Sequence, residues 1–174
     1  VFLAFGVCLA VPELRLGFSA YLQHLFQGMD LTDGAGNLSP LLLLANNLRA
    51  CAVTMLYGLI PFVRLPALAL GVNAVLLGGL ATCYAATDTT MLLYAASLLP
   101  HGIFELPALI LAFSMGLYIC GHLTRRCRRD PAALPLGACL GLAARLLVFL
   151  LLPLLILAAL TEAYVTPLAA GLFL

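Results

Sequence analysis

The sequence predicts an all-α membrane protein, a polytopic bundle of transmembrane helices, on three observations. The chain is 64% apolar and only 9% charged, and its mean hydropathy is +1.16. Its apolar residues form several runs of about 20, the length that a helix needs to cross the hydrocarbon core of a bilayer. A soluble domain of this size could not hide so much apolar surface from water. Lipid is therefore the expected solvent, and residues 1–174 are expected to form a single transmembrane domain.

Five spans are predicted, each from an apolar run bounded by turn-forming or charged residues. They cover residues 1–21, 41–62, 65–86, 103–122 and 136–160. A proline and two charged residues interrupt the first run, so this helix is expected to continue along the membrane surface as an interfacial segment. Residues 91–99 are apolar but too short to cross, and Pro100 and Gly102 are expected to break the helical pattern after them. The bundle thus has about five spans plus short interfacial or re-entrant segments.

The arginines predict the orientation, because loops rich in Lys and Arg stay in the cytoplasm. A cluster of four follows the fourth span: Arg125, Arg126, Arg128 and Arg129. This loop is expected inside, and counting back places Arg64 inside as well and the loop with Asp30 and Asp33 outside. The expected location is the inner (cytoplasmic) membrane, crossed several times. The arginine cluster also suits contact with anionic membrane lipid.

Polar side chains within the predicted spans are the candidate functional residues, because such groups are costly in lipid and usually face a bundle interior or a cavity. They are Asn46, Asn47, Arg49, Asn73, His101, Glu105 and Glu162. With the predicted topology, those on the second, fourth and fifth spans fall near the outer face, at depths that differ by about two helical turns. His101 and Glu105 are four residues apart, so a helix places them on one face.

Two interpretations of this polar cluster stay open. In the first, Arg49 pairs with Glu105 or Glu162 and the asparagine amides bridge helices, with each interhelical hydrogen bond contributing about 0.6 kcal/mol. In the second, His101, Glu105 and Glu162 bind a metal ion, and zinc is the candidate because imidazole and carboxylate groups are among its ligands. The metalloprotease motif lacks its second His and its Glu here, and no nucleophile–base pair can be named. No catalytic residue is therefore predicted, and the chain is not expected to be an enzyme.

The net charge and the small residues limit which classes of partner the protein can bind. The net charge of +1 excludes nucleic acid, because no basic face is large enough to track phosphates. Gly137 and Gly141 are four residues apart and form a helix-packing motif. Membrane lipid and other membrane proteins are the expected partners, and a homo-oligomer is a further candidate.

Three short segments carry a resemblance to known proteins. Residues 100–108 read Pro-His-Gly-Ile-Phe-Glu-Leu-Pro-Ala, Asn46-Asn47 opens the second span, and residues 161–167 read Thr-Glu-Ala-Tyr-Val-Thr-Pro. Together they resemble the stage II sporulation protein M family of bacterial and archaeal membrane proteins. Asn73 stands where such proteins carry an Asn-Gly pair, although Ala74 replaces the glycine. The resemblance covers nearly the whole chain.

The resemblance implies a membrane protein without established enzymatic activity. In endospore formers the namesake is similar to a scaffold that assembles with murein-degrading partners and drives septal wall thinning and engulfment of the forespore. Many relatives belong to organisms that form no spores. The resemblance therefore implies a membrane scaffold that recruits cell-envelope proteins. A transporter, channel or lipid-handling protein is the alternative, because intramembrane charges often mark substrate paths, and an intramembrane metal-binding protein is a third hypothesis.

Overall fold

The computed structural model describes residues 39–86 and 91–171, together with residues 13, 17, 18, 20, 21 and 24. This part of the chain is helical and contains no strand. Its elements are α3 (Pro40–Leu56), the 3₁₀ turn η1 (Tyr57–Leu59), α4 (Leu65–Ala86), α5 (Met91–Cys127), α6 (Leu136–Leu146), the π segment η2 (Leu147–Leu151), α7 (Leu152–Leu160), the π segment η3 (Thr161–Val165) and α8 (Thr166–Gly171). The prediction of an all-α fold is thus confirmed.

Four helical segments within the described residues are long and apolar enough to cross a membrane. They are Pro40–Leu59, Leu65–Thr82, Gly102–Cys127 and Leu136–Leu168. They correspond to the second to fifth predicted spans, so the membrane-bundle prediction is confirmed with roughly four spans. The first predicted span, its interfacial continuation and the loop with Asp30 and Asp33 lie almost entirely outside the described residues.

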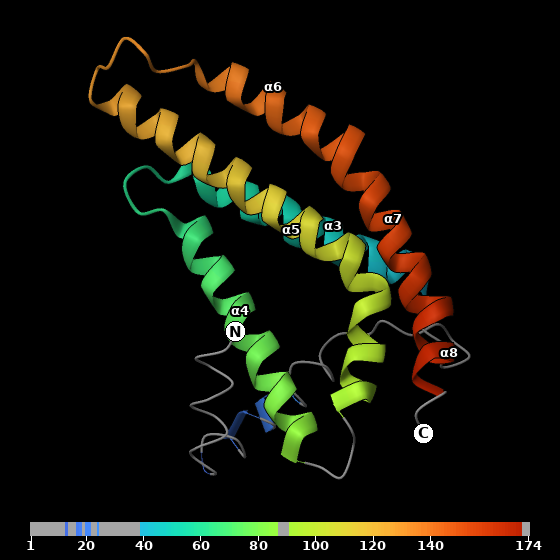
Figure 1. The fold of residues 1–174 in the computed structure, drawn as a ribbon. Helices are drawn as coiled ribbons and strands as arrows, with labels where there is room; N and C mark the ends of the chain where they lie inside the picture. The colour runs from blue at the N-terminus through green and yellow to red at the C-terminus, as the bar shows by residue number, and fades with distance from the viewer. Residues whose placement is uncertain are drawn as a thin grey trace.

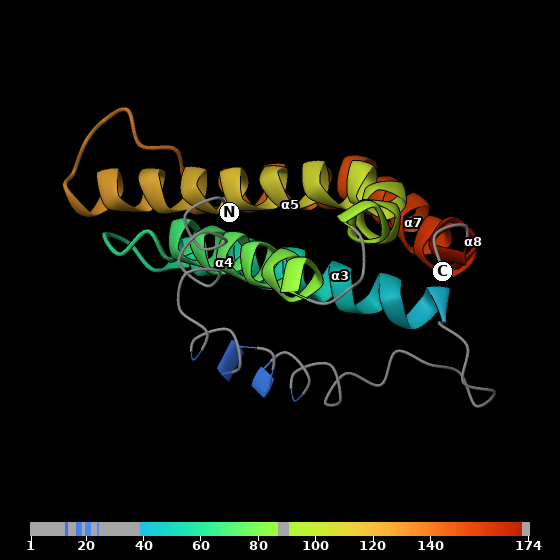
Figure 2. The same ribbon diagram turned by 60° about the horizontal axis from the view of Figure 1, so that its bottom comes forward.

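Helix α5 is the centre of the bundle. It packs against α3, α4, α6, α7 and α8, whereas α3 and α4 make few contacts with each other. Figure 1 shows α4 diverging from α3, and Figure 2 shows α5 and α7 in one layer above α3 and α4. Every other helix is therefore positioned by the surface that α5 offers it.

The predicted helix break at Pro100 and Gly102 is wrong. Helix α5 runs without interruption from Met91 to Cys127, with Pro100 and Pro107 inside it. At 1.5 Å per residue its 37 residues would extend about 55 Å, well beyond the hydrocarbon core of about 30 Å. Figures 1 and 2 show α5 changing direction in its first half, as expected where prolines remove backbone hydrogen bonds. The prolines bend this helix instead of ending it.

The last helical stretch also continues beyond its predicted end at residue 160, through two π segments. Each π segment ends two residues before a proline, η2 before Pro153 and η3 before Pro167. A proline ring clashes with the carbonyl four residues earlier, and here that carbonyl belongs to Phe149 or Ala163, within the wider π turn. The wider turn accommodates the proline, so the chain stays helical across the membrane.

The core lies where α3, α5 and α7 meet, and it combines small residues with large aliphatic ones. Ala108 and Ala112 of α5 and Cys51 of α3 are completely buried, as is Leu155 of α7. Small side chains let helix backbones approach closely, which is the main source of packing energy between helices in lipid. Cys51 is a free, buried cysteine and acts here as a small apolar residue.

Two glycines that the sequence analysis passed over make the closest backbone approach. A Cβ on Gly58 would collide with the backbone of Gly116, and a Cβ on Gly116 would lie 2.8 Å from both the Thr54 carbonyl oxygen and the Pro66 ring. A Cβ on Gly79 of α4 would likewise collide with the ring of Phe18. The contacts of Gly116 hold the connection between α3 and α4 against α5.

Candidate functional site

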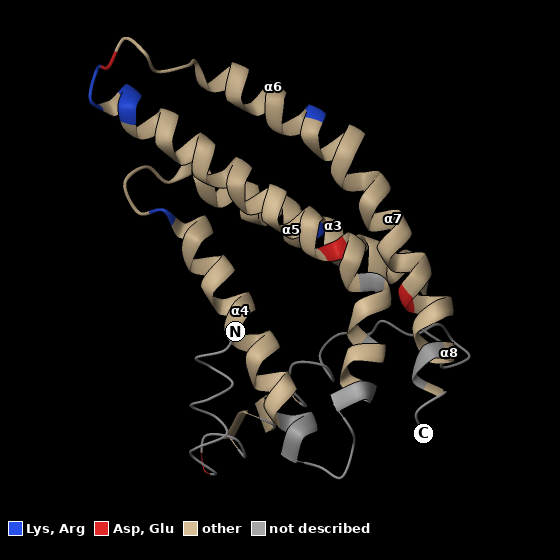
Figure 3. Cartoon of the chain, in the orientation of Figure 1, with Lys and Arg blue, Asp and Glu red and all other residues tan. Residues whose placement is uncertain are grey.

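The two connections that carry arginine lie at one end of the bundle, as the topology predicted. The N–H of Phe62, between α3 and α4, donates a 3.0 Å hydrogen bond to Oγ1 of Thr124 near the end of α5. The guanidinium of Arg128 lies 5.9 Å from the centre of the Phe62 ring. Figure 3 shows basic residues gathered at this end, where α5 passes into α6 and α4 begins. The structure therefore brings the two connections together, and the side of the membrane that they face stays a prediction.

Glu105 and Glu162 lie on neighbouring elements, away from the arginine end. Glu105 shares a face of α5 with the completely buried Ala108 and Ala112, so it lies on the side that faces the bundle interior. α5 packs against η3, which carries Glu162. Both side chains are half-buried, and they interact electrostatically with each other. Two of the three residues predicted to bind a metal therefore lie on elements that pack together, and metal binding by them stays a prediction.

The π segment η3 determines how Glu162 is presented. In its wider turn the Thr161 carbonyl accepts the backbone N–H of Thr166, five residues later, and also a 3.2 Å hydrogen bond from the Thr166 hydroxyl. The Thr161 hydroxyl donates to the carbonyls of Leu157 and Ala158 one turn earlier, at 2.8 Å each. π segments frequently occur at functional sites because they change the direction of a side chain within an otherwise regular helix.

Helix α3 supplies the third wall of this region. Asn46 and Asn47 are half-buried on it, whereas Arg49 is exposed. The buried Cys51 thiol interacts electrostatically with Glu105, which places the middle of α3 beside the carboxylates. The predicted pairing of Arg49 with Glu105 or Glu162 stays a prediction.

Asn73 lies in a different environment from the carboxylates. Its side-chain amide donates a 3.0 Å hydrogen bond to the Ala69 carbonyl of its own helix, α4. It lines a groove of about 540 Å³ between α3 and α4 with Ala50, Thr54 and Tyr57 among its neighbours. The Asn73 amide therefore has its hydrogen-bond partner within α4 and lines the groove toward α3, not the region of Glu105 and Glu162.

The predicted metal site can be followed only in part. His101 lies in α5 one turn before Glu105, but its side chain lies outside the described part of the structure. Among the side chains that are described, no three of His, Cys, Asp or Glu converge as metal ligands. The two glutamates without the imidazole offer two ligands, so metal binding by the full triad stays a prediction.

Comparison with known protein families decides the relationship of the chain. A family model described as "Stage II sporulation protein M" matches residues 1–167. The chain belongs to the stage II sporulation protein M family. No curated protein and no solved structure matches it.

The segments that suggested the stage II sporulation protein M family are also those that meet in space. Residues 100–108 form the bent part of α5 and carry Glu105, and residues 161–167 form η3 and the start of α8 and carry Glu162. Both contain prolines that shape their helices. The electrostatic contact between Glu105 and Glu162 therefore links two motifs that are far apart in the sequence.

The arginine end contains features that sequence reasoning missed. Among the described residues other than glycine, three have a positive φ, namely Phe62 (71°), Arg64 (49°) and Arg129 (58°), and all lie in these two connections. Phe62 and Thr124 carried no signal of their own in the sequence, because their importance comes from a hydrogen bond across 62 residues. Only the surrounding prolines and arginines indicated an unusual connection.

Proposed function

We propose that this protein is a membrane scaffold that recruits or organises cell-envelope proteins, with murein-remodelling proteins as the first partners to test. Membership of the stage II sporulation protein M family supports this role. The observation that carries the proposal is the small share of each span that the chain itself covers, between 28% and 39% of the most apolar window. Such helices leave broad surfaces that lipid or partner helices can cover.

Helix α6 offers the most suitable surface for a partner helix. Gly137 and Gly141 are exposed there, and a Cβ added to either would meet no other atom within 4 Å. Leu140 and Leu142 beside them are also exposed. A helix with small residues of its own can approach such a face closely, and van der Waals contact then drives association. The partner is a second protein of the envelope or a second copy of this chain.

Site-specific photo-crosslinking tests the scaffold role. A photoreactive residue at Leu140, in cells of the native host, is expected to capture a murein-remodelling or other envelope protein reproducibly. The Gly141→Leu substitution fills the space and should abolish the product. Gly71→Leu on α4 is the matched control, because Gly71 is also open but has Val75 one turn later. Crosslinks to lipid alone, or capture that Gly141→Leu leaves unchanged, would contradict the proposal.

The scaffold is proposed to act without catalysis. The sequence predicts no catalytic residue, so Glu105 and Glu162 are assigned a structural or ion-binding role. A turnover activity of the purified protein that Glu105→Gln abolishes, with the fold intact, would refute this assignment.

A second candidate function, binding or conduction of a cation, is favoured by the two carboxylates. Two like charges in apolar surroundings are stable together only with a positive charge beside them, whether a proton, a metal ion or a guanidinium. Elemental analysis of detergent-purified protein, beside His101→Ala and Glu105→Gln, tests for zinc. Near-stoichiometric zinc that both variants lose would establish metal binding, and flux of cations into liposomes would establish transport.

The proposed orientation places the arginine connections in the cytoplasm and the Glu105–Glu162 pair near the outer face of the inner membrane. The distribution of arginines supports it, because basic short loops are retained inside.

A further inference from the structure

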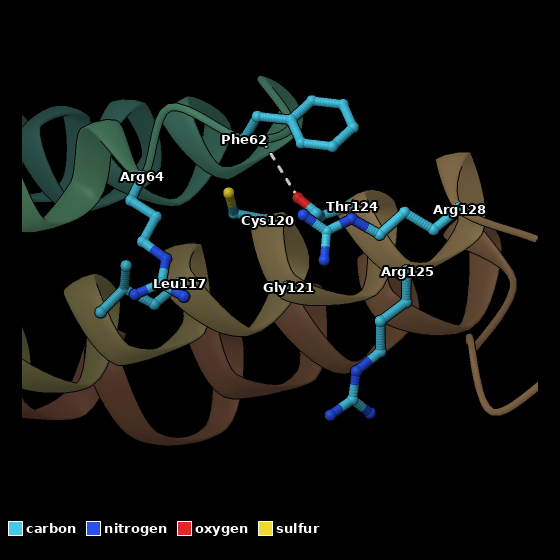
Figure 4. Close-up of a pocket in the computed structure, with 8 residues that line it drawn as sticks. All are labelled: Phe62, Arg64, Leu117, Cys120, Gly121, Thr124, Arg125 and Arg128. Atoms are coloured by element: carbon cyan, nitrogen blue, oxygen red, sulfur yellow. Dashed lines mark hydrogen bonds between the residues drawn. The ribbon is translucent and has the colours of Figure 1, made fainter. Parts of the chain in front are cut away.

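A cavity lined by arginines opens at the end of the bundle where α3 connects to α4 and α5 ends. Its volume is about 420 Å³. Its walls come from both sides of the connection: Phe62, Arg64, Leu117, Cys120, Gly121, Thr124, Arg125 and Arg128. Figure 4 shows the side chains of Arg64 and Arg128 entering from opposite sides of Gly121, with Arg125 directed away from them.

A second hollow of about 280 Å³ adjoins the first. Leu117, Gly121 and Arg125 line both hollows, and Tyr118 and His122 complete the second. Arg125 therefore stands between the two, and Gly121 forms part of both floors. The lining of the two hollows contains three arginines and a histidine, and no acidic side chain. The acidic residue in the adjacent loop, Asp130, accepts a hydrogen bond of 2.9 Å from the N–H of Ala132, which closes a turn of that loop.

The walls of the larger cavity are held in place before any ligand arrives. Phe62 donates to Thr124 across the cavity rim, and the Cys120 thiol donates to the Ile60 carbonyl at 3.4 Å. Phe62 and Arg64 both adopt the left-handed backbone conformation that side chains rarely adopt. Such strain persists only where surrounding contacts enforce it, and it is concentrated at ligand-binding sites.

The ligand must be anionic and is best matched by a phosphate group. Guanidinium groups bind phosphate oxygens through paired, charge-assisted hydrogen bonds. The cavity lies at the ends of membrane-spanning helices, and exposed apolar side chains flank it, among them Leu59, Ile60 and Val63. A phosphate that is attached to acyl chains would satisfy both surfaces together, whereas free phosphate would satisfy only the arginines.

We propose that this arginine cavity is a binding site for the phosphate group of an anionic membrane lipid. The headgroup phosphate lies between Arg64 and Arg128, and the acyl chains run along the exposed apolar surface of the connection. Anionic lipid then fastens the connection between α3 and α4 to the end of α5. This site is independent of the proposed scaffold role and would exist in the absence of any partner protein.

Native mass spectrometry of the full chain in detergent tests the site, with phosphatidylglycerol, phosphatidylcholine or inorganic phosphate added in turn. The wild type is expected to retain one phosphatidylglycerol with at least about tenfold preference over phosphatidylcholine, as three nearby arginines predict. Gly121→Leu extends a side chain from a position that lines the cavity, where a Cβ meets nothing within 4 Å, and should abolish the preference. Gly141→Leu, on the open face of α6, should leave it unchanged.

Further variants keep the test decisive if Gly121→Leu does not fold. Arg64→Gln should then reduce the preference several-fold, whereas Arg145→Gln, which removes an exposed arginine from α6, should not. Equal retention of the two lipids by the wild type would overturn the proposal, as would an undiminished preference in Gly121→Leu or Arg64→Gln. Displacement of the lipid by millimolar inorganic phosphate would assign the site to a soluble anion and overturn the lipid assignment.

Discussion

At one end of the bundle the side chains that meet are arginines, and away from it they are carboxylates. The arginine end consists of connections between helices, with left-handed residues at Phe62, Arg64 and Arg129. The carboxylate region consists of helices that continue past it, bent by prolines in α5 and widened into the π segment η3. Arg64 and Arg129 are thus held by irregular backbone, and Glu105 and Glu162 by distorted helix.

The proposed topology explains this difference, because it places the carboxylate region in lipid and the arginine connections at the membrane surface. Inside lipid every backbone N–H and C=O group must find a partner within the protein, so the chain can change direction only while it remains hydrogen-bonded. The π segments η2 and η3 satisfy that condition beside Pro153 and Pro167. At the membrane surface water can complete the hydrogen bonds of a turn, and the chain is free to reverse. The protein adjusts geometry by helix distortion in one region and by loops in the other.

The largest expected effect tests whether the arginine end depends on close backbone contact. Gly116→Leu would drive a side chain into the Thr54 carbonyl and the Pro66 ring. Neither can move away easily, so we expect a loss of about 3 kcal/mol of stability, the upper end of what overpacking costs. Thermal unfolding in detergent measures it, with Gly121→Leu on the same helix as the open-space control. Equal melting temperatures for the two variants would show that the contact is unimportant.

A smaller effect is expected at the carboxylates. Replacement of Glu105 or Glu162 by Gln removes a charge from apolar surroundings and should stabilise the protein. Because the two side chains interact, the double variant should gain less than the sum of the single ones, with a coupling of about 1–2 kcal/mol. The same cycle with Glu105→Gln and Arg145→Gln is the control and should be additive within about 0.5 kcal/mol. If the stability changes of the two glutamate variants are additive, the two carboxylates do not interact.

The smallest effect distinguishes the hydrogen bonds of the two regions. Thr124→Val removes the acceptor of the Phe62 N–H and should cost about 1 kcal/mol in unfolding free energy. Thr161→Val in η3 removes a hydroxyl that donates only to carbonyls of its own helical stretch, so its cost should be close to zero. A larger loss from Thr161→Val than from Thr124→Val would reverse the comparison, because η3 would then depend on that hydroxyl.

Apolar patterning was sufficient to predict the spans of α3, α4 and α5, because hydropathy and length decide whether a segment crosses lipid. It misjudged Pro100 and Gly102, which were expected to break the helix, because α5 continues through both in a bundle whose neighbours stabilise it. It also missed η3, since a π segment differs from an α-helix by one hydrogen-bond step that no composition records. The position of Pro167 was the available signal.

The candidate site was predicted to a similar extent. Topology and the rise per residue placed Glu105 and Glu162 at depths that differ by about two helical turns, and in the structure they lie on elements that pack together and interact electrostatically. The same reasoning could not place Asn73, whose amide returns to its own helix, because depth does not indicate which face of a helix a residue occupies. The arginine cavity needed the tertiary contacts of Phe62 and Thr124, which depend on residues far apart in the sequence.

Thiol labelling from each side of the membrane tests the central claim, that the arginine end and the end of α8 face opposite sides with the arginines inside. Cys127 is exposed at the arginine end, whereas Cys51, Cys120 and Cys139 are buried and should not react. In a Cys8→Ser, Cys83→Ser background, a membrane-impermeant maleimide should label Cys127 in inverted vesicles only. With Cys127→Ser and Gly171→Cys, labelling should occur in right-side-out vesicles only. Labelling of both positions from the same side would contradict the account.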